Sequence, residues 1–315
     1  MKKVVTIVGP TSIGKTDLAF EIANDYNGEL VSADSVQVYK GLDTISGKDI
    51  PEGYKFFSLP QFSTLELYAG YYTNSSFPPI YLLDVVEPPF EFTVSHFHSL
   101  ATKIVDFVEK KGKLPIIVGG TGLYINSLIG GLDQLPPPDL KLRKMLENEN
   151  LERLQELVPA EVLNKMNNSD RNNSRRLIRA IEVSKSKIVK NIEKPDFEYL
   201  VLGLNCDREA LKKRIDQRVE KRLQNGAIDE INKLFKIYDQ LSPQVKDANG
   251  YRQLFAYLKG DSSLSEATER WKLSEYKHAK NQMTWFNKYG EVNWFDILDK
   301  DYKVRVKEKI NKFLG

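Results

Sequence analysis

A glycine-rich loop near the N-terminus constrains the fold of this chain more than any other feature. It fits the pattern G-x-x-x-x-G-K-[ST] over Gly9, Pro10, Thr11, Ser12, Ile13, Gly14, Lys15 and Thr16. A short apolar run at residues 4–8 precedes it and apolar residues at helical spacing follow, which predicts a buried strand, a turn and a helix. Glycines let successive backbone N–H groups surround a phosphate at the helix N-terminus, where Lys15 adds a full charge. The loop therefore predicts a di- or triphosphate ligand, with Thr16 able to hold Mg²⁺.

Strands alternate with helices over the first 130 residues. An amphipathic helix is predicted at residues 97–108, and further strands at residues 29–32, 80–86, 115–118 and 199–204. This alternation is typical of an α/β fold in which helices flank a parallel sheet, here of the P-loop NTPase-like kind. The aromatic-rich residues 51–79 are expected to be irregular.

Three consecutive prolines at residues 136–138 interrupt this order. Helical patterns alone follow, up to about residue 195. We therefore expect an all-helical module at residues 136–196, inserted into a catalytic core formed by residues 1–135 and 197–315.

Composition narrows the class of protein. The chain has 46 Lys and Arg against 43 Asp and Glu, a net charge of +3, which excludes a uniformly basic surface but leaves local basic clusters open. A single cysteine, Cys206, excludes a disulfide framework. No apolar run reaches the roughly 20 residues of a membrane span, and residues 4–8 are too few for the core of a signal peptide. We expect a cytoplasmic protein without membrane contact.

Asp34 follows the second predicted strand, at the edge of the sheet where ligands gather in open α/β folds. It could ligate Mg²⁺, act as a base, or cap the next helix, and the residues alone leave these three roles open. Two weaker signals accompany it. The sequence Leu82-Leu83-Asp84 is similar to a Walker B strand, and residues 119–124 form a second strand-to-helix glycine turn.

Two arginine clusters have different interpretations. Arg214, Arg218 and Arg222 share one helix face, and the acidic residues among them make a solvated surface the ordinary interpretation. The denser cluster within residues 175–179 lies in the expected inserted module, where a basic face could bind a polyanion.

These motifs resemble those of the tRNA dimethylallyltransferase family, in the same order and over almost the whole chain. Besides the glycine-rich loop, they are residues 32–43, Leu82 to Asp84, Gly119 to Tyr124, Arg176 to Val183, Arg214 to Ile231, Gly250-Tyr251 and Gln282 to Phe286. The resemblance implies transfer of a dimethylallyl group from dimethylallyl diphosphate to N6 of adenosine 37 in tRNA, with release of diphosphate. It further implies the anticodon stem-loop as the part of tRNA that is bound, Mg²⁺ as cofactor, and a monomeric enzyme.

The resemblance also implies roles for single residues. Asp34 is the expected base, because the N6 lone pair is delocalised into the ring and its proton must be removed. Thr16 with Mg²⁺, Arg218 and the loop at residues 9–16 are expected to bind the diphosphate and to neutralise its charge. The implied tRNA contacts are Asp34, Ser35, Val36, Gln37, Thr121, Arg143, Arg175, Arg176 and Arg179.

Three other functions remain open at this stage. An adenylate isopentenyltransferase acting on free AMP, ADP or ATP would use the same diphosphate site but would not need the inserted module. A P-loop RNA-binding protein without catalysis is suggested by departures from the family pattern at Glu275 and Asn281, which make that motif less basic. The set of Lys15, Thr16, Asp34 and Arg218 is intact, which favours an enzyme. An ATP-dependent kinase or ATPase is supported by the glycine-rich loop alone.

Overall fold

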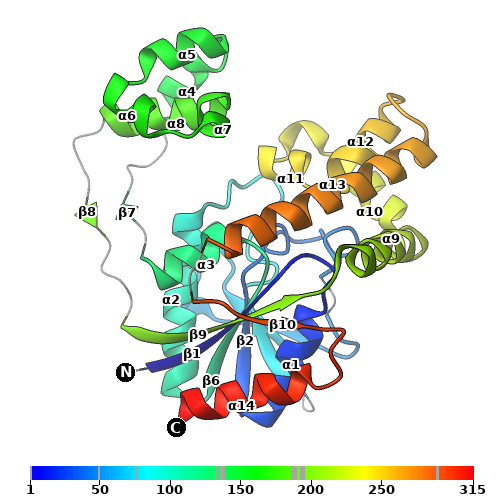
Figure 1. The fold of residues 1–315 in the computed structure, drawn as a ribbon. Coiled ribbons are helices and arrows are strands. Elements are labelled where there is room, and N and C mark those ends of the chain that lie inside the picture. Colours follow the sequence, from blue (N-terminus) through cyan, green and yellow to red (C-terminus); the bar gives the residue numbers. More distant parts are fainter. Residues whose placement is uncertain are drawn as a thin grey trace. The chain divides into compact units, whose positions relative to one another are not determined.

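The chain folds into two compact units (Figure 1). Unit 1 comprises Met1–Gly130 and Pro195–Gly315, and unit 2 comprises Gly131–Lys194. The computed structural model describes residues 2–48, 50–74, 77–131, 133–134, 139–185, 190–191, 196–288 and 291–315. The proline run at residues 136–138 lies outside the described residues.

A parallel sheet forms the centre of unit 1. Its strands are β1 (Lys2–Val8), β2 (Gly28–Ser32), β3 (Lys55–Ser58), β4 (Gly70–Asn74), β5 (Phe77–Tyr81), β6 (Leu114–Val118), β9 (Phe197–Asn205) and β10 (Asn293–Asp296). Within the described residues they make one eight-stranded sheet in the order β10-β9-β1-β6-β2-β5-β4-β3. Neighbours from β10 to β5 pair in parallel, and β4 and β3 extend the sheet antiparallel. The predicted α/β fold with a parallel sheet is confirmed.

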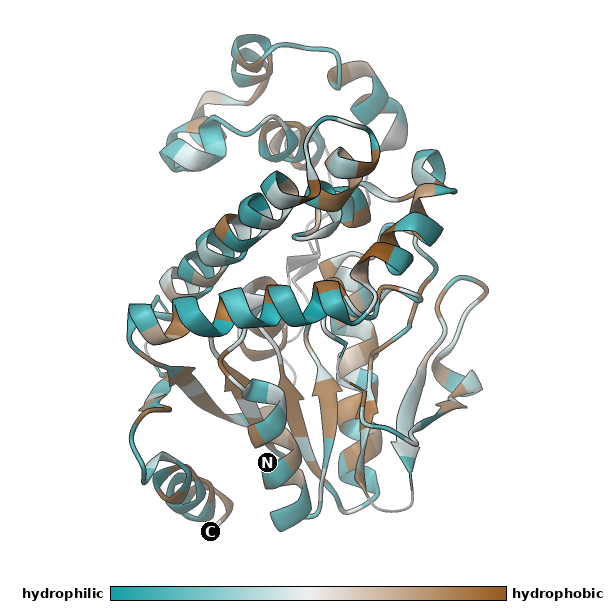
Figure 2. Ribbon diagram, turned by 90° about the vertical axis from the view of Figure 1, so that its right-hand side faces the viewer, coloured by the Kyte–Doolittle hydropathy of each residue, from teal (hydrophilic) through white to brown (hydrophobic). Residues whose placement is uncertain are grey.

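Helices cover both faces of this sheet. In unit 1 they are α1 (Lys15–Asp25), α2 (Val94–Lys110), α3 (Gly122–Ile129), α9 (Arg208–Gln224), α10 (Ala227–Phe235), α11 (Pro243–Asp247), α12 (Tyr251–Leu258), α13 (Leu264–Phe286) and α14 (Tyr302–Leu314), with 3₁₀ turns at Pro60–Phe62 and Tyr238–Gln240. Val4 and Val8 of β1 share a core with α2 and α3, whereas Val5 and Ile7 share a core with α1 and α14. Strands buried on both faces are mostly apolar, as the brown segments of the central strands in Figure 2 show.

Two predictions about the edge of the sheet were wrong. The strand predicted at residues 80–86 ends at Tyr81, because Leu82 and Asp84 adopt left-handed backbone angles, with φ of 62° and 54°, that cannot continue a strand. Residues 51–79 are not irregular throughout, since they contain β3 and β4. Their aromatic rings pair across the strands, and the rings of Phe57 and Tyr71 are stacked 5.5 Å apart.

Unit 2 has its own small core. Its helices are α4 (Leu140–Leu146), α5 (Leu151–Leu157), α6 (Ala160–Lys165), α7 (Asn168–Arg171) and α8 (Ser174–Lys185). Leu154, Leu177 and Ile181 are fully buried among them. The sequence predicted helices alone for the inserted segment, and the structure adds a short antiparallel pair, β7 (Asp133–Gln134) with β8 (Lys190–Asn191).

Candidate active site

A cavity of about 810 Å³ opens in unit 1 beside the carboxyl ends of β1, β2 and β6. The segments that follow these strands line it, together with residues of α9 and α13. The carboxyl ends of parallel strands are the usual ligand site of open α/β sheets, because loops and helix N-termini converge there.

The glycine-rich loop forms one wall of this cavity. Its lining residues are Thr11, Ser12, Gly14, Lys15 and Thr16. Ile13 packs into the core instead, and a Cβ at Gly9 would lie 2.5 Å from the carbonyl oxygen of Leu204, so this position requires glycine. Helix α1 begins at Lys15, directly after Gly14 with its left-handed φ of 96°. The loop thus has the strand–turn–helix geometry of an anion site.

The amine of Lys15 is enclosed by the loop. Its Nζ donates a hydrogen bond to the carbonyl oxygen of Pro10 at 2.7 Å. Desolvation, and then repulsion by Arg218, lower the pKa of Lys15 to about 7, although Asp34 and Glu275 act in the opposite direction. A bound polyanion would favour the ammonium form and raise this pKa again.

Asp34 begins a tight turn after β2. Its Oδ1 accepts hydrogen bonds from the backbone N–H groups of Val36, at 2.9 Å, and Gln37, at 3.2 Å. Asp34 therefore caps the residues that follow it, but these residues form a turn and not a helix. The hydroxyl of Thr121, which precedes α3, accepts a hydrogen bond from the N–H of Ser35 at 3.1 Å. All five residues line the cavity, so the structure brings these predicted site residues together with the glycine-rich loop.

The three arginines of α9 line the cavity. Arg214 is exposed, as a solvated surface predicts, whereas Arg222 is buried. Arg214 Nε donates to the carbonyl oxygen of Ser12 at 2.8 Å. Arg218 Nη1 donates to the hydroxyl of Thr11 at 3.2 Å. Arg222 forms an ion pair with Glu275 of α13, with 3.6 Å between Nη1 and Oε1. The spacing of four residues places all three guanidinium groups along one wall.

A buried glutamate holds the loop that these arginines contact. Glu230 of α10 accepts hydrogen bonds from the backbone N–H groups of Asp43, Thr44 and Ile45 at 2.9, 2.6 and 3.2 Å. The carbonyl oxygen of Gly47, farther along this loop, accepts a hydrogen bond from Arg218 Nη2 at 3.4 Å. Sequence reasoning missed Glu230, because a glutamate on an amphipathic helix carries no signal of burial.

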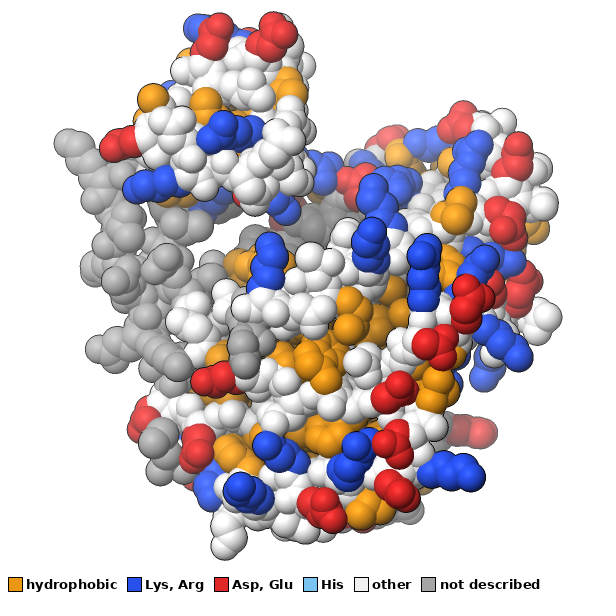
Figure 3. Space-filling view, viewed as in Figure 1, with side chains coloured by type: hydrophobic (Ala, Val, Ile, Leu, Met, Phe, Trp, Pro, Cys, Tyr) orange, Lys and Arg blue, Asp and Glu red, His pale blue; other side chains and the backbone are white. Residues whose placement is uncertain are grey.

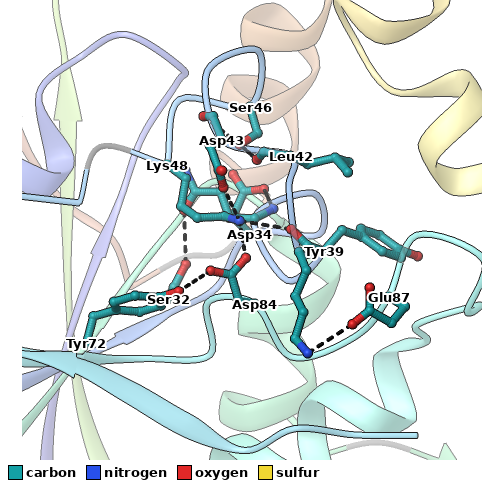
Figure 4. A network of polar contacts seen from close by, with 12 residues as sticks. Ser32, Asp34, Tyr39, Leu42, Asp43, Ser46, Lys48, Tyr72, Asp84 and Glu87 are labelled. Carbon is teal, nitrogen blue, oxygen red and sulfur yellow. Dashed lines mark hydrogen bonds and ion pairs between the residues drawn. The ribbon is translucent and has the colours of Figure 1, made fainter. Parts of the chain in front are cut away.

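Lys48 ends the same loop and is buried among acidic and polar groups. Figure 4 shows it between Asp43 and Asp84, with the hydroxyl of Tyr72 directed at Asp84. The Nζ of Lys48 lies 2.8 Å from Asp43 Oδ1 and 2.9 Å from the carbonyl oxygen of Tyr39. Asp84 does not line the cavity, so the residue with a Walker B appearance serves here as the partner of a buried lysine.

The remaining predicted contacts belong to unit 2. Arg143 and Arg179 both pair with the buried Glu182, at 2.7 Å and 3.0 Å. Arg176 pairs with Asp170, and Arg175 is exposed. The buried carboxylate orients two guanidinium groups and offsets part of their charge. Figure 3 shows lysine and arginine side chains on the visible face of this unit.

Comparison with known proteins gives matches over the whole chain. The family described as IPP transferase matches residues 74–289, and the family described as isopentenyl transferase matches residues 2–57. A tRNA dimethylallyltransferase of Acetivibrio thermocellus is 38% identical, over 96% of this chain and 95% of that protein. One of Thermoanaerobacter sp. is 36% identical, over 99% of this chain and 98% of that protein.

Solved structures show the same similarity. The tRNA isopentenylpyrophosphate transferase of Bacillus halodurans is 28% identical, with a TM-score of 0.68 over 99% of this chain and 98% of that chain. A eukaryotic dimethylallyltransferase that acts on tRNA has the same fold, with a TM-score of 0.75 and 24% sequence identity. It matches 100% of this chain and 80% of that chain. Within the described residues, none of the helices has the length and apolar character needed to cross a lipid bilayer.

Proposed function

The chain belongs to the IPP transferase family, that of the tRNA dimethylallyltransferases, and we propose that it transfers the dimethylallyl group of dimethylallyl diphosphate to N6 of adenosine 37 in tRNA. The anticodon stem-loop is the part of tRNA that this reaction requires, since position 37 adjoins the anticodon. One observation of the site carries the proposal: the glycine-rich loop and the Asp34 turn line the same cavity. A site for a leaving diphosphate and a carboxylate base thus lie in one chamber.

The reaction needs both groups. A bond forms between N6 of the adenine and C1 of the dimethylallyl group, while the bond from C1 to the diphosphate oxygen breaks and its electron pair leaves with the diphosphate. The amine loses one proton, which we propose Asp34 accepts. Loop N–H groups, Lys15 and Arg218 stabilise the charge that grows on the diphosphate. The adenine must leave the stack of the anticodon loop to enter the cavity.

Magnesium fits this site as an ion shared with the substrate. Among the described residues, no cluster of three or more Asp, Glu, His or Cys side chains could hold a metal by itself. The hydroxyl of Thr16 at the start of α1 lines the cavity, and Mg²⁺ commonly takes few protein ligands beside substrate phosphates and water. We propose that Thr16 and the diphosphate hold Mg²⁺, which would neutralise charge on the leaving group.

The arginines of unit 2 support tRNA rather than a free nucleotide as the acceptor. Arg143, Arg175, Arg176 and Arg179 belong to unit 2, a separate compact helical unit. A small acceptor such as AMP has no use for such a unit, whereas a tRNA offers phosphates over a long surface. We propose that these arginines bind the RNA and that the enzyme acts as a monomer.

A labelling experiment tests the function. Purified protein is incubated with radiolabelled dimethylallyl diphosphate, Mg²⁺ and either tRNA lacking the modification or AMP. We expect label in tRNA, at adenosine 37. Label in AMP would identify an adenylate isopentenyltransferase, and absence of label from both would indicate an RNA-binding protein without catalysis.

Arg218→Ala tests the proposed diphosphate site. Removing a guanidinium group beside the loop should raise KM for dimethylallyl diphosphate by about tenfold or more, because the substrate then has one charge-assisted hydrogen bond fewer. Steady-state kinetics with tRNA saturating measure this. Arg208→Ala, an exposed arginine of the same helix that does not line the cavity, is the matched control. An unchanged KM in Arg218→Ala would contradict the assigned role.

The double variant Arg175→Ala/Arg176→Ala tests the RNA surface. We expect tRNA affinity to fall by about tenfold and the slope of log K against log salt to decrease by one to two, roughly one for each phosphate that the protein no longer neutralises. KM for dimethylallyl diphosphate should not change. Filter binding at several salt concentrations gives both values. Arg153→Ala is the control, since this exposed arginine of unit 2 pairs with Glu156 at 2.8 Å. If Arg153→Ala lowered tRNA affinity equally, the weaker binding would come from the change in the net charge of the protein and not from a specific contact.

A further inference from the structure

The side chain of Gln282 bridges two walls of the cavity. It comes from the last turns of α13 and is only 7% exposed. Its Oε1 accepts a hydrogen bond from the backbone N–H of Thr11, in the glycine-rich loop, at 2.8 Å. Its Nε2 donates to the carbonyl oxygen of Gly120, in the turn after β6, at 2.9 Å. Both ends of the amide are therefore used, one on each wall.

The turn after β6, which Gln282 contacts, is hydrogen-bonded to the turn that carries Asp34. The N–H of Thr121, next to Gly120, donates to the carbonyl oxygen of Ala33 at 3.2 Å. The hydroxyl of Thr121 accepts from the N–H of Ser35 at 3.1 Å. Ala33 and Ser35 are the chain neighbours of Asp34. Hydrogen bonds and adjacent residues thus connect the glycine-rich loop to the turn that carries Asp34, and the Gln282 amide makes the first step of this path.

The Gln282 amide lies directly against Gly120, in the turn after β6. A Cβ at Gly120 would lie 2.1 Å from Gln282 Nε2, whereas the next backbone atom, the carbonyl oxygen of Gly9, would be at an ordinary 3.8 Å. An alanine at this position would therefore displace the end of the Gln282 side chain and leave the backbone in place. At Gly119, by contrast, a Cβ would lie 2.2 Å from the backbone oxygen of Ala33, which cannot move aside.

We infer that Gln282 is a positioning residue that sets the separation between the diphosphate cradle and Asp34, an inference that rests on the proposed function. Donor carbon and acceptor nitrogen must approach in line, with the leaving group behind the carbon. A misplacement of about 1 Å can slow such a step by about 100-fold without removing any group that binds substrate. Gln282 therefore affects the rate of transfer more than the affinity for tRNA or for dimethylallyl diphosphate.

Gln282→Leu removes both hydrogen bonds while keeping the volume of the side chain. We expect the single-turnover rate of transfer to fall about 10- to 100-fold. The dissociation constants of tRNA alone and of an unreactive thiolo analogue of dimethylallyl diphosphate should each change by less than about threefold. Gly120→Ala should give the same pattern, and the two changes combined should cost little more than either one, because both break the same bridge. Thr284→Val is the control, since Thr284 is exposed on the same helix and donates to the carbonyl oxygen of Lys280 within it.

Two outcomes of the kinetic and binding measurements would overturn the inference. One is a normal single-turnover rate in Gln282→Leu, and the other is a decrease of the rate and of both affinities in proportion to the fraction of unfolded protein. Hydrogen exchange at the Thr11 amide tests the bridge without any activity. Faster exchange in Gln282→Leu than in Thr284→Val supports the bridge, and equal exchange refutes it. If the unsubstituted protein labels neither tRNA nor AMP, the proposed function fails, and this exchange measurement still decides whether the bridge exists.

Discussion

Asp34→Asn is expected to lower the turnover number by about two orders of magnitude or more, while tRNA binding is kept. The substitution is conservative for structure, because an asparagine Oδ1 can accept the same two hydrogen bonds from the N–H groups of Val36 and Gln37 that shape the turn. It removes the basicity of the group, since an amide oxygen does not take up a proton near neutral pH. The decrease should therefore fall on the chemical step.

Single-turnover kinetics with labelled dimethylallyl diphosphate measure this prediction, with tRNA affinity determined separately. Asp34→Ala provides a comparison, because it removes the base and also the acceptor that holds the turn. If Asp34 acts only as a cap, the alanine variant is impaired and the asparagine variant turns over normally. That result would refute the assignment of Asp34 as the base.

The strongest parts of the fold prediction came from local patterns. Residues 4–8 are apolar except for Thr6 and a glycine turn follows, and these features depend on neighbours in the sequence. The strand β1, the loop and α1 were predicted on that basis and are confirmed. The end of β5 was not predictable in this way, because nothing in Leu82 indicates a left-handed backbone. The strands β3 and β4 were not predicted either. β3 is exposed along its whole length, and β4 is half-buried after Gly70, so neither alternates between buried and exposed residues.

The candidate site shows the same limit. The motifs identified Lys15, Asp34 and Thr121, which the structure gathers around one cavity. Gln282 belongs to a motif of the family, but neither its role nor that of Glu230 could be assigned from sequence, because both depend on which backbone groups the side chains reach across the fold. Gln282 contacts Thr11, and Glu230 contacts the loop at residues 43–45. Contacts between residues so far apart in the chain are set by the topology of the sheet.

Lys15→Met is the second change for which we expect a large effect. Removal of the charge at the diphosphate should lower kcat/KM for dimethylallyl diphosphate by about 100-fold or more, as removal of a donor at a developing charge does in other enzymes. The same substitution should raise the melting temperature of the free protein near pH 7. The unfolded chain holds a proton on this lysine up to a pH of about 10.4, whereas the folded chain loses it near pH 7. Between these pH values the unfolded state binds more protons than the folded state, so the free energy of unfolding is lowered, most strongly at the lower pH. Methionine carries no titratable group and therefore removes this decrease.

The depressed pKa of Lys15 also predicts how ligand binding depends on pH. An unreactive thiolo analogue of dimethylallyl diphosphate is fully ionised above pH 7, because the last phosphate ionisation lies near pH 6. Its binding favours the ammonium form of Lys15, so each mole bound takes up part of a proton, and affinity should fall by up to about tenfold per pH unit above pH 7. Calorimetry in two buffers of different ionisation enthalpy, at pH 7, 8 and 9, measures both effects. Lys15→Met should show neither. Proton uptake that persists in Lys15→Met would assign the linkage to another group, and the assignment to this amine would then be wrong.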